Sequence, residues 1–183
     1  MNNFDSSDEE GDTDLSPFKI DWIDYSLAGC PEFLGISGLP GCRFKDTWRS
    51  LSSDIETLKS EGITEIFILC TRGELSKYRV PRLLQEYQKA DIVVHHYSFP
   101  DGSVPSVPNC MKMLEEIRVC LMSGRKAMVH CFGGLGRSCL VAVCLMGSGA
   151  IQTVKQYNFI HDFRRILEEH ESSQENEIRS ISR

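Results

Sequence analysis

Apolar residues in the middle of the chain switch between short continuous runs and the spacing of amphipathic helices. The continuous runs predict buried strands across 63–70, 91–99 and 126–130. Segment 33–44 predicts a short strand followed by a Gly/Pro turn. Helical spacing predicts helices over 46–62, 81–90, 109–124, 138–146 and 153–170. The polar segments 71–80 and 100–108 predict loops. Strands and helices therefore alternate, which predicts an α/β fold: an open, mainly parallel sheet flanked by helices on both faces.

Both ends of the chain differ in composition from this central part. Residues 1–14 hold six acidic residues and no Lys or Arg, and 1–16 have too few apolar groups to form a core. We therefore expect a disordered acidic arm over 1–16 and one folded domain over 17–170. The polar residues 171–183 predict a flexible tail.

The charge distribution excludes several classes of partner. The formal net charge is −6, and outside 1–14 the chain has 20 acidic and 20 basic residues. A neutral domain without a basic stripe argues against a nucleic-acid-binding protein. No apolar stretch approaches the roughly 20 residues of a membrane span, and the acidic N-terminus does not resemble a secretory signal. We expect a monomer in the cytoplasm, with a perinuclear or nuclear location as the alternative.

The cysteines and histidines do not show the spacing of a metal site. The chain has eight cysteines but no C-x-x-C pair, so we expect reduced thiols and no metal. His95 and His96 are adjacent, and in a strand they point to opposite faces, which favours structural roles.

The segment HCFGGLGRS, residues 130–138, has the composition of an anion-binding loop. It follows the predicted strand 126–130 directly, and ligands of open α/β sheets bind beyond the carboxyl ends of strands. Its glycines allow the backbone amides of Phe132, Gly133, Gly134, Leu135 and Gly136 to turn inward. The helix that follows adds unpaired N–H groups and the positive end of its dipole.

The same loop carries a nucleophile and a cation. Positive charge and a helix N-terminus favour the thiolate form of a cysteine, so Cys131 is the predicted nucleophile. The Arg137 guanidinium suits two phosphate oxygens, and Ser138 is placed to hydrogen-bond the sulfur. Phosphoryl transfer also needs an acid for the leaving oxygen, and Asp101 follows the neighbouring predicted strand. A simple Asp-Gly turn is the alternative interpretation of Asp101.

H-C-x-x-G-x-x-R-S resembles the active-site motif of the cysteine-dependent protein phosphatases. The order of Asp101 before Cys131 resembles the dual-specificity and tyrosine-specific branches, which implies a protein-tyrosine-phosphatase-like fold and no cofactor. The segment SGAIQTVKQYNFIHDF, residues 148–163, is similar to the glutamine-bearing loop and helix of the tyrosine phosphatases. The resemblance gives Gln152 the role of positioning the hydrolytic water.

Five segments, among them FDSSDEE, FLGISGLPGCRFKD and CTRGELSKYRVPRLL, are similar to the family of cyclin-dependent-kinase-associated phosphatases. This resemblance covers nearly the whole chain. It implies removal of phosphate from the activation-segment threonine of a cyclin-dependent kinase, and a role in the cell cycle. Relative to that family, about twenty residues, comparable with one helix, are missing between Met146 and Gly147.

Two alternatives to a protein phosphatase stay open at this point. The missing helix favours a catalytically weak kinase-binding module that uses the same surface. A lipid or RNA phosphatase is the less favoured alternative, because residues 132–136 contain no lysine for a multiply phosphorylated ligand.

Overall fold

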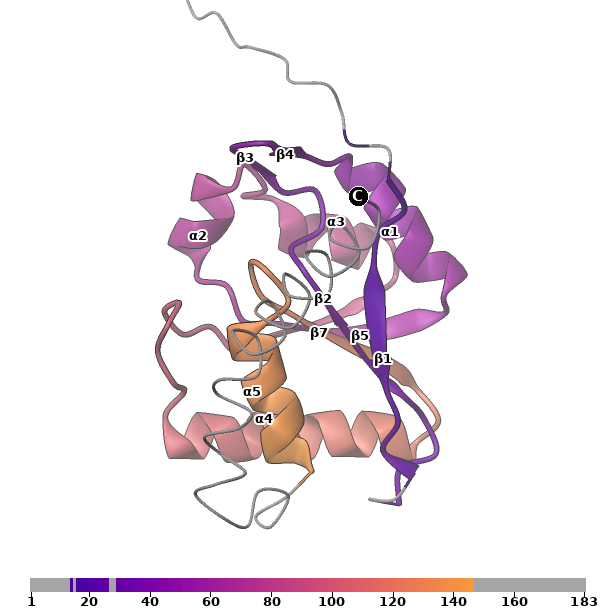
Figure 1. The fold of residues 1–183 in the computed structure, drawn as a ribbon. Coiled ribbons are helices and arrows are strands. Elements are labelled where there is room, and N and C mark those ends of the chain that lie inside the picture. The colour runs from indigo at the N-terminus through magenta and orange to yellow at the C-terminus, as the bar shows by residue number, and fades with distance from the viewer. Residues whose placement is uncertain (1–13, 15, 27–28, 147–183) are drawn as a thin grey trace, which may run out of the picture. The chain divides into compact units, whose positions relative to one another are not determined.

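A computed structural model describes residues 14, 16–26 and 29–146. Five strands form one sheet in the order β1-β2-β7-β5-β6, and all neighbours are parallel except β1 and β2 (Figure 1). These strands are β1 (Ile20–Ile23), β2 (Leu34–Ser37), β5 (Ile63–Ile68), β6 (Val93–His96) and β7 (Lys126–His130). The mainly parallel sheet confirms the predicted fold class.

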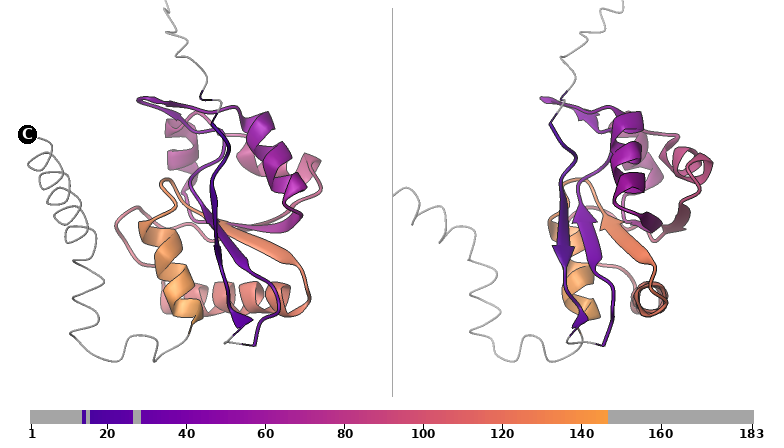
Figure 2. Two further views of the ribbon diagram at one scale, coloured as in Figure 1. Left: turned by 45° about the vertical axis from the view of Figure 1, so that its right-hand side comes forward. Right: turned by 90° about the vertical axis from the view of Figure 1, so that its right-hand side faces the viewer.

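Helices cover both faces of the sheet, as the views in Figure 2 show. One hydrophobic cluster packs α4 (Val107–Met122) and α5 (Gly136–Leu145) against the sheet, and it includes Met113, Ile117 and Val141. The second cluster, on the other face, includes Leu58, Leu75 and Leu83. These residues come in order from α1 (Leu51–Ser60), α2 (Arg72–Lys77) and α3 (Leu83–Lys89). The central strands β5 and β7 are buried from both sides, which explains their continuous apolar runs.

Four features differ from the sequence-based prediction. The loop predicted over 71–80 is wrong, because this segment contains α2. The helix predicted from residue 46 begins only at Leu51, where the Ser50 side chain accepts a hydrogen bond from the Ser53 amide. Trp48 instead lies in β4 (Thr47–Trp48), which pairs with β3 (Arg43–Phe44). The edge strand β1 was not predicted.

The described part of the expected acidic arm contacts the domain. Asp14 forms an ion pair with Arg49, whose Nη1 lies 3.1 Å from its carboxylate, and Arg49 also binds the buried carboxylate of Asp54. Residues 1–13 and 15 of the expected arm lie outside the described residues. The predicted helix over 153–170 and the predicted tail over 171–183 lie outside them as well. Within the described part of the chain, no helix has both the length and the apolar character needed to cross a membrane.

Candidate active site

The predicted site residues from 101 to 138 meet at one edge of the sheet. Strand β7 ends at His130, Cys131 follows it at once, and α5 begins at Gly136. The neighbouring parallel strands β5 and β6 end at the same edge, and the loop after β6 carries Asp101. The Cys131 residue is 3% exposed. Its position at the carboxyl end of a central strand is the usual ligand-binding position of such sheets.

Close packing against β2 fixes the conformation of the loop between β7 and α5. Gly134 has a φ of +71°, and a Cβ added there would lie 2.6 Å from the Ser37 carbonyl carbon. No atom lies within 4 Å of a Cβ added at Gly133 or Gly136. The Leu39 amide donates a hydrogen bond of 3.0 Å to the carbonyl of Phe132. Gly134 is therefore the glycine that the close approach of the two chain segments requires.

Several hydrogen-bond donors of the loop have no acceptor in the part of the chain that the structure describes. Among the described residues, none accepts a hydrogen bond from the backbone amides of 132–135. The buried Arg137 Nε and Ser138 Oγ also lack a hydrogen-bond partner within the described residues. Buried polar groups are normally paired, so such a group of donors next to a cysteine needs an explanation. A bound oxyanion at the N-terminus of α5 would supply acceptors for all of them.

Arg137 is buried, and protein oxygens hold most of its guanidinium. Its Nη1 donates to the carbonyls of Leu69 and Phe99 at 3.1 and 2.9 Å. Its Nη1 and Nη2 also donate to the two carboxylate oxygens of Glu74 at 3.0 and 2.7 Å. The Nε remains, with Asp101 Oδ1 at 3.4 Å as its ion-pair partner. The protein thus fixes the orientation of the guanidinium through one edge and leaves Nε for a ligand.

Electrostatics keep the Arg137–Glu74 pair ionised. Burial alone would raise the pKa of Glu74, but hydrogen bonds from Arg137 and Thr71 outweigh it, and the pKa lies below its ordinary value. Burial likewise opposes the charge of Arg137, yet the Glu74 carboxylate raises the arginine's pKa. The site therefore keeps a charged arginine although the surroundings are largely desolvated.

Asp101 lies on an exposed loop next to the arginine. Its side chain is 66% exposed, and its Oδ1 also accepts a hydrogen bond of 3.2 Å from the amide of Gly102. Gly102 has a φ of +72°, as expected of a turn. Asp101 is thus both part of an Asp-Gly turn and within ion-pair distance of Arg137. The two interpretations of this residue are compatible.

His130 is buried below the loop. Its Nε2 lies 3.1 Å from the hydroxyl of Tyr87, which comes from α3. Burial lowers the pKa of His130 to about 3, although a backbone contact with Cys131 opposes this. The imidazole is therefore neutral at physiological pH and is not available as a proton donor there.

Aromatic side chains line one side of the loop. The Phe132 ring stacks on Tyr78 with 4.1 Å between centroids, and Phe44 meets Tyr78 edge-on at 5.2 Å. Lys77 and Lys45 lie over the Phe44 ring at 5.2 and 5.6 Å. The loop itself lacks lysine, so these cations from α2 and the β3–β4 hairpin supply positive charge that the loop sequence alone did not reveal. A surface hollow beside this group is lined by Phe132, Gly133, Phe18, Lys19 and neighbouring residues.

Sequence reasoning missed Glu74 and Tyr87, and it assigned one residue that the structure does not describe. Glu74 was placed in a polar loop, but Thr71 and Glu74 form a capping box at the start of α2. The T-x-x-E pattern was the signal that predicts this helix. Gln152 lies outside the described residues, so its distance from Cys131 is not defined.

Comparison with known proteins points to one family. A family model described as cyclin-dependent kinase inhibitor 3 (CDKN3) matches residues 1–155. Cyclin-dependent kinase inhibitor 3 of Rattus norvegicus is 49% identical over 201 residues, covering 98% of this chain and 95% of the rat protein. The Homo sapiens protein of the same name is 48% identical with the same coverage. The aligned length of 201 residues exceeds the 183 of this chain, so these relatives contain at least 18 residues without a counterpart here.

Solved structures give the same result. Kinase associated phosphatase (KAP), crystallised with its catalytic-site cysteine substituted by serine, superposes with a TM-score of 0.71 at 47% identity. The match covers 84% of this chain and 98% of that chain. Tk-PTP, in a mutant form, superposes with a TM-score of 0.52 at 21% identity over 82% of this chain, which supports the fold alone.

Proposed function

The chain is a dual-specificity protein phosphatase of the cyclin-dependent kinase inhibitor 3 family, and we propose that it forms a phosphocysteine at Cys131. The observation that carries this proposal is the buried cysteine next to donors that have no hydrogen-bond partner within the described residues: the amides of 132–135, Arg137 Nε and Ser138 Oγ. This group suits the dianion of a phosphate monoester. The substrates are phosphothreonine, phosphoserine and phosphotyrosine in proteins.

In the first step the Cys131 thiolate attacks phosphorus and the bond to the leaving oxygen breaks. Asp101 donates a proton to that oxygen, so the leaving group departs as a neutral hydroxyl. The loop amides and Arg137 hold the equatorial oxygens of the transition state. Glu74 acts through Arg137 as a positioning residue, because both of its carboxylate oxygens accept hydrogen bonds from the guanidinium.

In the second step a water molecule attacks the phosphocysteine and the sulfur leaves as a thiolate. Asp101, now a carboxylate, accepts the proton of this water, and the Ser138 hydroxyl donates a hydrogen bond to the departing sulfur. We assign the positioning of the water to Gln152 on the family resemblance. Inorganic phosphate is then released, and no cofactor takes part.

We further propose a phosphorylated cyclin-dependent kinase as the protein substrate, in its activation segment, which places the enzyme in cell-cycle regulation. The names of the relatives and of the kinase associated phosphatase support this partner. The test measures phosphate release from a phosphorylated cyclin-dependent kinase by the full chain and by Cys131→Ser. Cys110→Ser, which removes a partly buried thiol of α4, is the matched control. Loss of release in Cys131→Ser alone supports the proposal, and equal release by all three proteins contradicts it.

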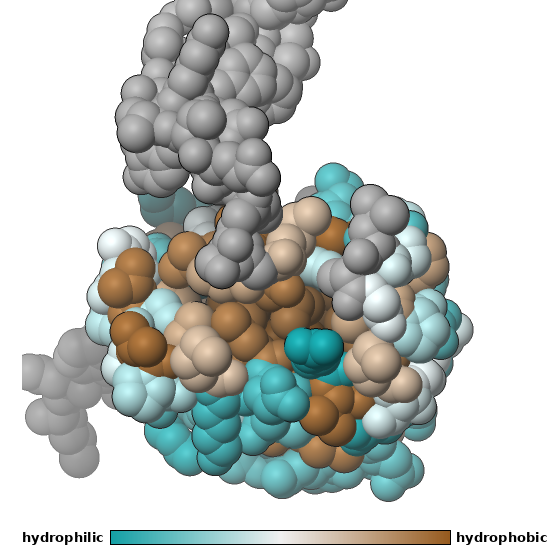
Figure 3. Space-filling model, turned by 90° about the horizontal axis from the view of Figure 1, so that it is seen from below, coloured by the Kyte–Doolittle hydropathy of each residue, from teal (hydrophilic) through white to brown (hydrophobic). Residues whose placement is uncertain are grey.

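A kinase-binding module with weak catalysis is the second candidate. It is favoured by the shorter chain, which lacks at least 18 residues of its relatives. It is also favoured by apolar side chains on the surface of α4 and α5, of which Val107, Met111 and Val143 are exposed. Figure 3 shows the face seen from below, where brown apolar side chains gather between teal polar ones. Kinase binding by both the wild type and Cys131→Ser, without phosphate release by either, would favour this candidate.

A further inference from the structure

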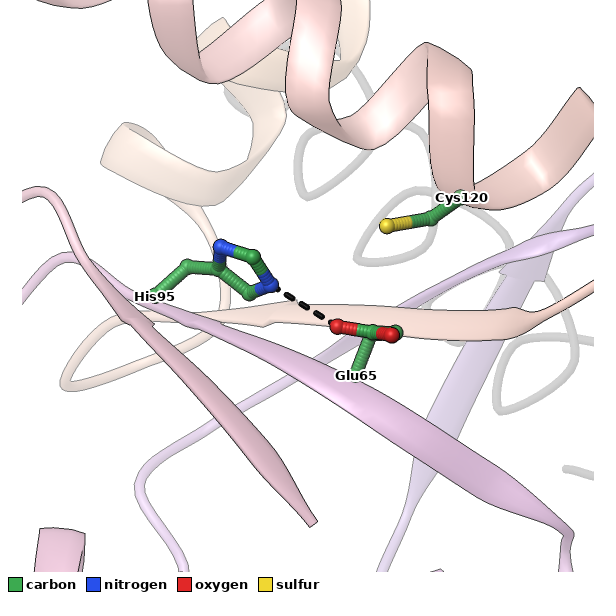
Figure 4. Close-up of side chains that lie close together, drawn as sticks. All are labelled: Glu65, His95 and Cys120. Atoms are coloured by element: carbon green, nitrogen blue, oxygen red, sulfur yellow. Dashed lines mark hydrogen bonds and ion pairs between the residues drawn. The ribbon is translucent and has the colours of Figure 1, made fainter. Parts of the chain in front are cut away.

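Three potential metal ligands lie together between the sheet and α4. Glu65 comes from β5, His95 from β6 and Cys120 from α4. The carboxylate, imidazole and thiol each offer one atom, and these atoms all lie within 4.8 Å of one another. Figure 4 shows the Cys120 sulfur pointing from the helix toward the other two side chains. None of the three belongs to the phosphate-binding loop.

His95 is held in the orientation that a metal ligand needs. Its Nδ1 lies 2.9 Å from Oε2 of Glu116, and its ring stacks on Phe67 with 4.3 Å between centroids. Its Nε2 therefore faces Oε2 of Glu65 at 2.8 Å. Metal-binding histidines characteristically donate their other ring N–H to a carboxylate in this way. His96, by contrast, donates to the Cys70 carbonyl and serves a structural role, as the sequence predicted.

The other two ligand atoms are also oriented by their surroundings. Arg125 binds the second carboxylate oxygen of Glu65, which leaves Oε2 directed toward His95. Cys120 is 2% exposed, and within the described residues its thiol makes no hydrogen bond to another residue. Burial raises the pKa of this thiol, and the Glu65 carboxylate raises it further. An ion-pair network explains Glu65, His95 and Glu116, but it gives no partner to the sulfur.

We propose that Glu65, His95 and Cys120 form a binding site for a divalent ion of the zinc type. Carboxylate oxygen, imidazole nitrogen and thiolate sulfur are the ligand types of Zn²⁺ and Co²⁺. On binding, the ion replaces the Nε2 proton that His95 donates to Glu65 and the proton of the Cys120 thiol, and both protons pass to solvent. Two carboxylates and a thiolate then balance the dipositive ion and Arg125. A water molecule completes the tetrahedron.

The three ligands join two strands of the sheet to the helix that covers them. An ion bound there stabilises the folded state, because the ligands are not assembled in the unfolded chain. Spacing along the sequence did not predict this site, since its ligands come from three elements and no C-x-x-C pair is involved. The expectation of a chain without metal was based on the lack of a C-x-x-C pair and on the structural roles expected of His95 and His96 as neighbours in a strand.

The test uses the full chain with Cys131→Ser, so that the reactive thiol of the loop cannot bind the metal. Zn²⁺ is titrated against a competing chelator, and Co²⁺ is titrated while its sulfur-to-metal charge-transfer absorption is followed. Cys120→Ser and His95→Gln are compared in the same background. Cys110→Ser, on the same helix but outside the trio, is the control. The melting temperature of each variant is recorded with and without Zn²⁺.

We expect one Zn²⁺ per chain, a raised melting temperature, and a cobalt–thiolate band that Cys120→Ser removes and Cys110→Ser retains. Glu116→Gln, which alters the carboxylate that orients His95, should weaken affinity by about 10–100-fold. Equal metal affinity in Cys120→Ser and the control would overturn the proposal. If Cys120→Ser does not fold, the Cys131→Ser background protein provides the test. Absence of a cobalt–thiolate band in that protein would overturn the proposal.

Discussion

The guanidinium of Arg137 and the carboxylate of Glu74 form a two-point ion pair, with Nη2 to Oε1 at 2.7 Å and Nη1 to Oε2 at 3.0 Å. The two residues are 63 positions apart in the sequence, so the pair joins α2 to the start of α5. Because one edge of the guanidinium is held in this way, the remaining Nε has a fixed direction. The geometry of the proposed phosphate site thus depends on a residue outside the loop.

We therefore expect Glu74→Gln to lose about 3 kcal/mol of unfolding free energy, because it leaves the buried Arg137 without its counter-charge. Turnover should fall as well, since the guanidinium loses its fixed orientation. Urea denaturation and steady-state kinetics measure the two effects. Glu86→Gln, which breaks the exposed pair with Lys89, is the control and should change stability by less than about 1 kcal/mol. Similar losses in both variants would contradict the importance of the buried pair.

Gly134→Ala should destabilise the protein by on the order of 3 kcal/mol. The added Cβ would lie 2.6 Å from the Ser37 backbone, and φ at this position is +71°. Gly136→Ala provides a matched control, because its Cβ would meet no atom within 4 Å at the start of α5. We expect this control to keep the wild-type unfolding free energy within about 1 kcal/mol. Equal stability of the two alanine variants in urea would show that the close approach is not required.

Asp101→Asn should reduce turnover by about 10²–10⁴-fold on a peptide phosphothreonine, whose leaving alkoxide needs a proton. With an aryl phosphate that carries an electron-withdrawing group, the leaving oxygen needs little protonation, and the loss should be much smaller. The ratio of the two rates therefore separates an acid from a mere turn residue. An identical loss on both substrates would indicate that Asp101 acts through the loop conformation or through Arg137 alone.

Stability should depend on pH through His130. Burial lowers the pKa of this histidine to about 3 in the folded protein, whereas an unfolded histidine titrates near 6.5. Between these values the unfolded chain binds the extra proton, so the free energy of unfolding decreases as the pH falls from about 6.5 toward 3. The slope contributed by one such group is at most about 1.4 kcal/mol per pH unit. In His130→Gln, denaturation between pH 5 and 6 should show a flatter slope, and an unchanged slope would contradict this assignment.

The sheet and most of its helices could be predicted because their signals are local. Strands β5 and β7 have continuous apolar runs since both faces are buried, and Gly124, with a φ of +71°, follows the end of α4 as expected. Cys131 and Asp101 could be placed at one edge because parallel strands end together. These inferences needed only the order of elements and the direction of the strands.

The partners of the site residues could not be predicted, because they come from distant parts of the chain. Nothing in the sequence near Arg137 indicates that Glu74 binds it, or that Tyr87 contacts His130. Trp48 matched helical spacing, but its indole donates to the Lys45 carbonyl in the β3–β4 hairpin, and the helix begins later. Tertiary packing decided these positions, whereas local pattern decided the core strands.

Trapping the phosphocysteine intermediate on Cys131 is the measurement that tests the proposed mechanism most directly. The enzyme is mixed with a phosphorylated substrate, quenched with acid within its first turnover, digested, and analysed by mass spectrometry. We expect one phosphate on the peptide that contains Cys131, and none on any peptide of Cys131→Ser. Gln152→Ala should increase the trapped amount if this residue positions the hydrolytic water. Substrate hydrolysis at the wild-type rate without phosphate on Cys131 at any quench time would contradict covalent catalysis by this residue.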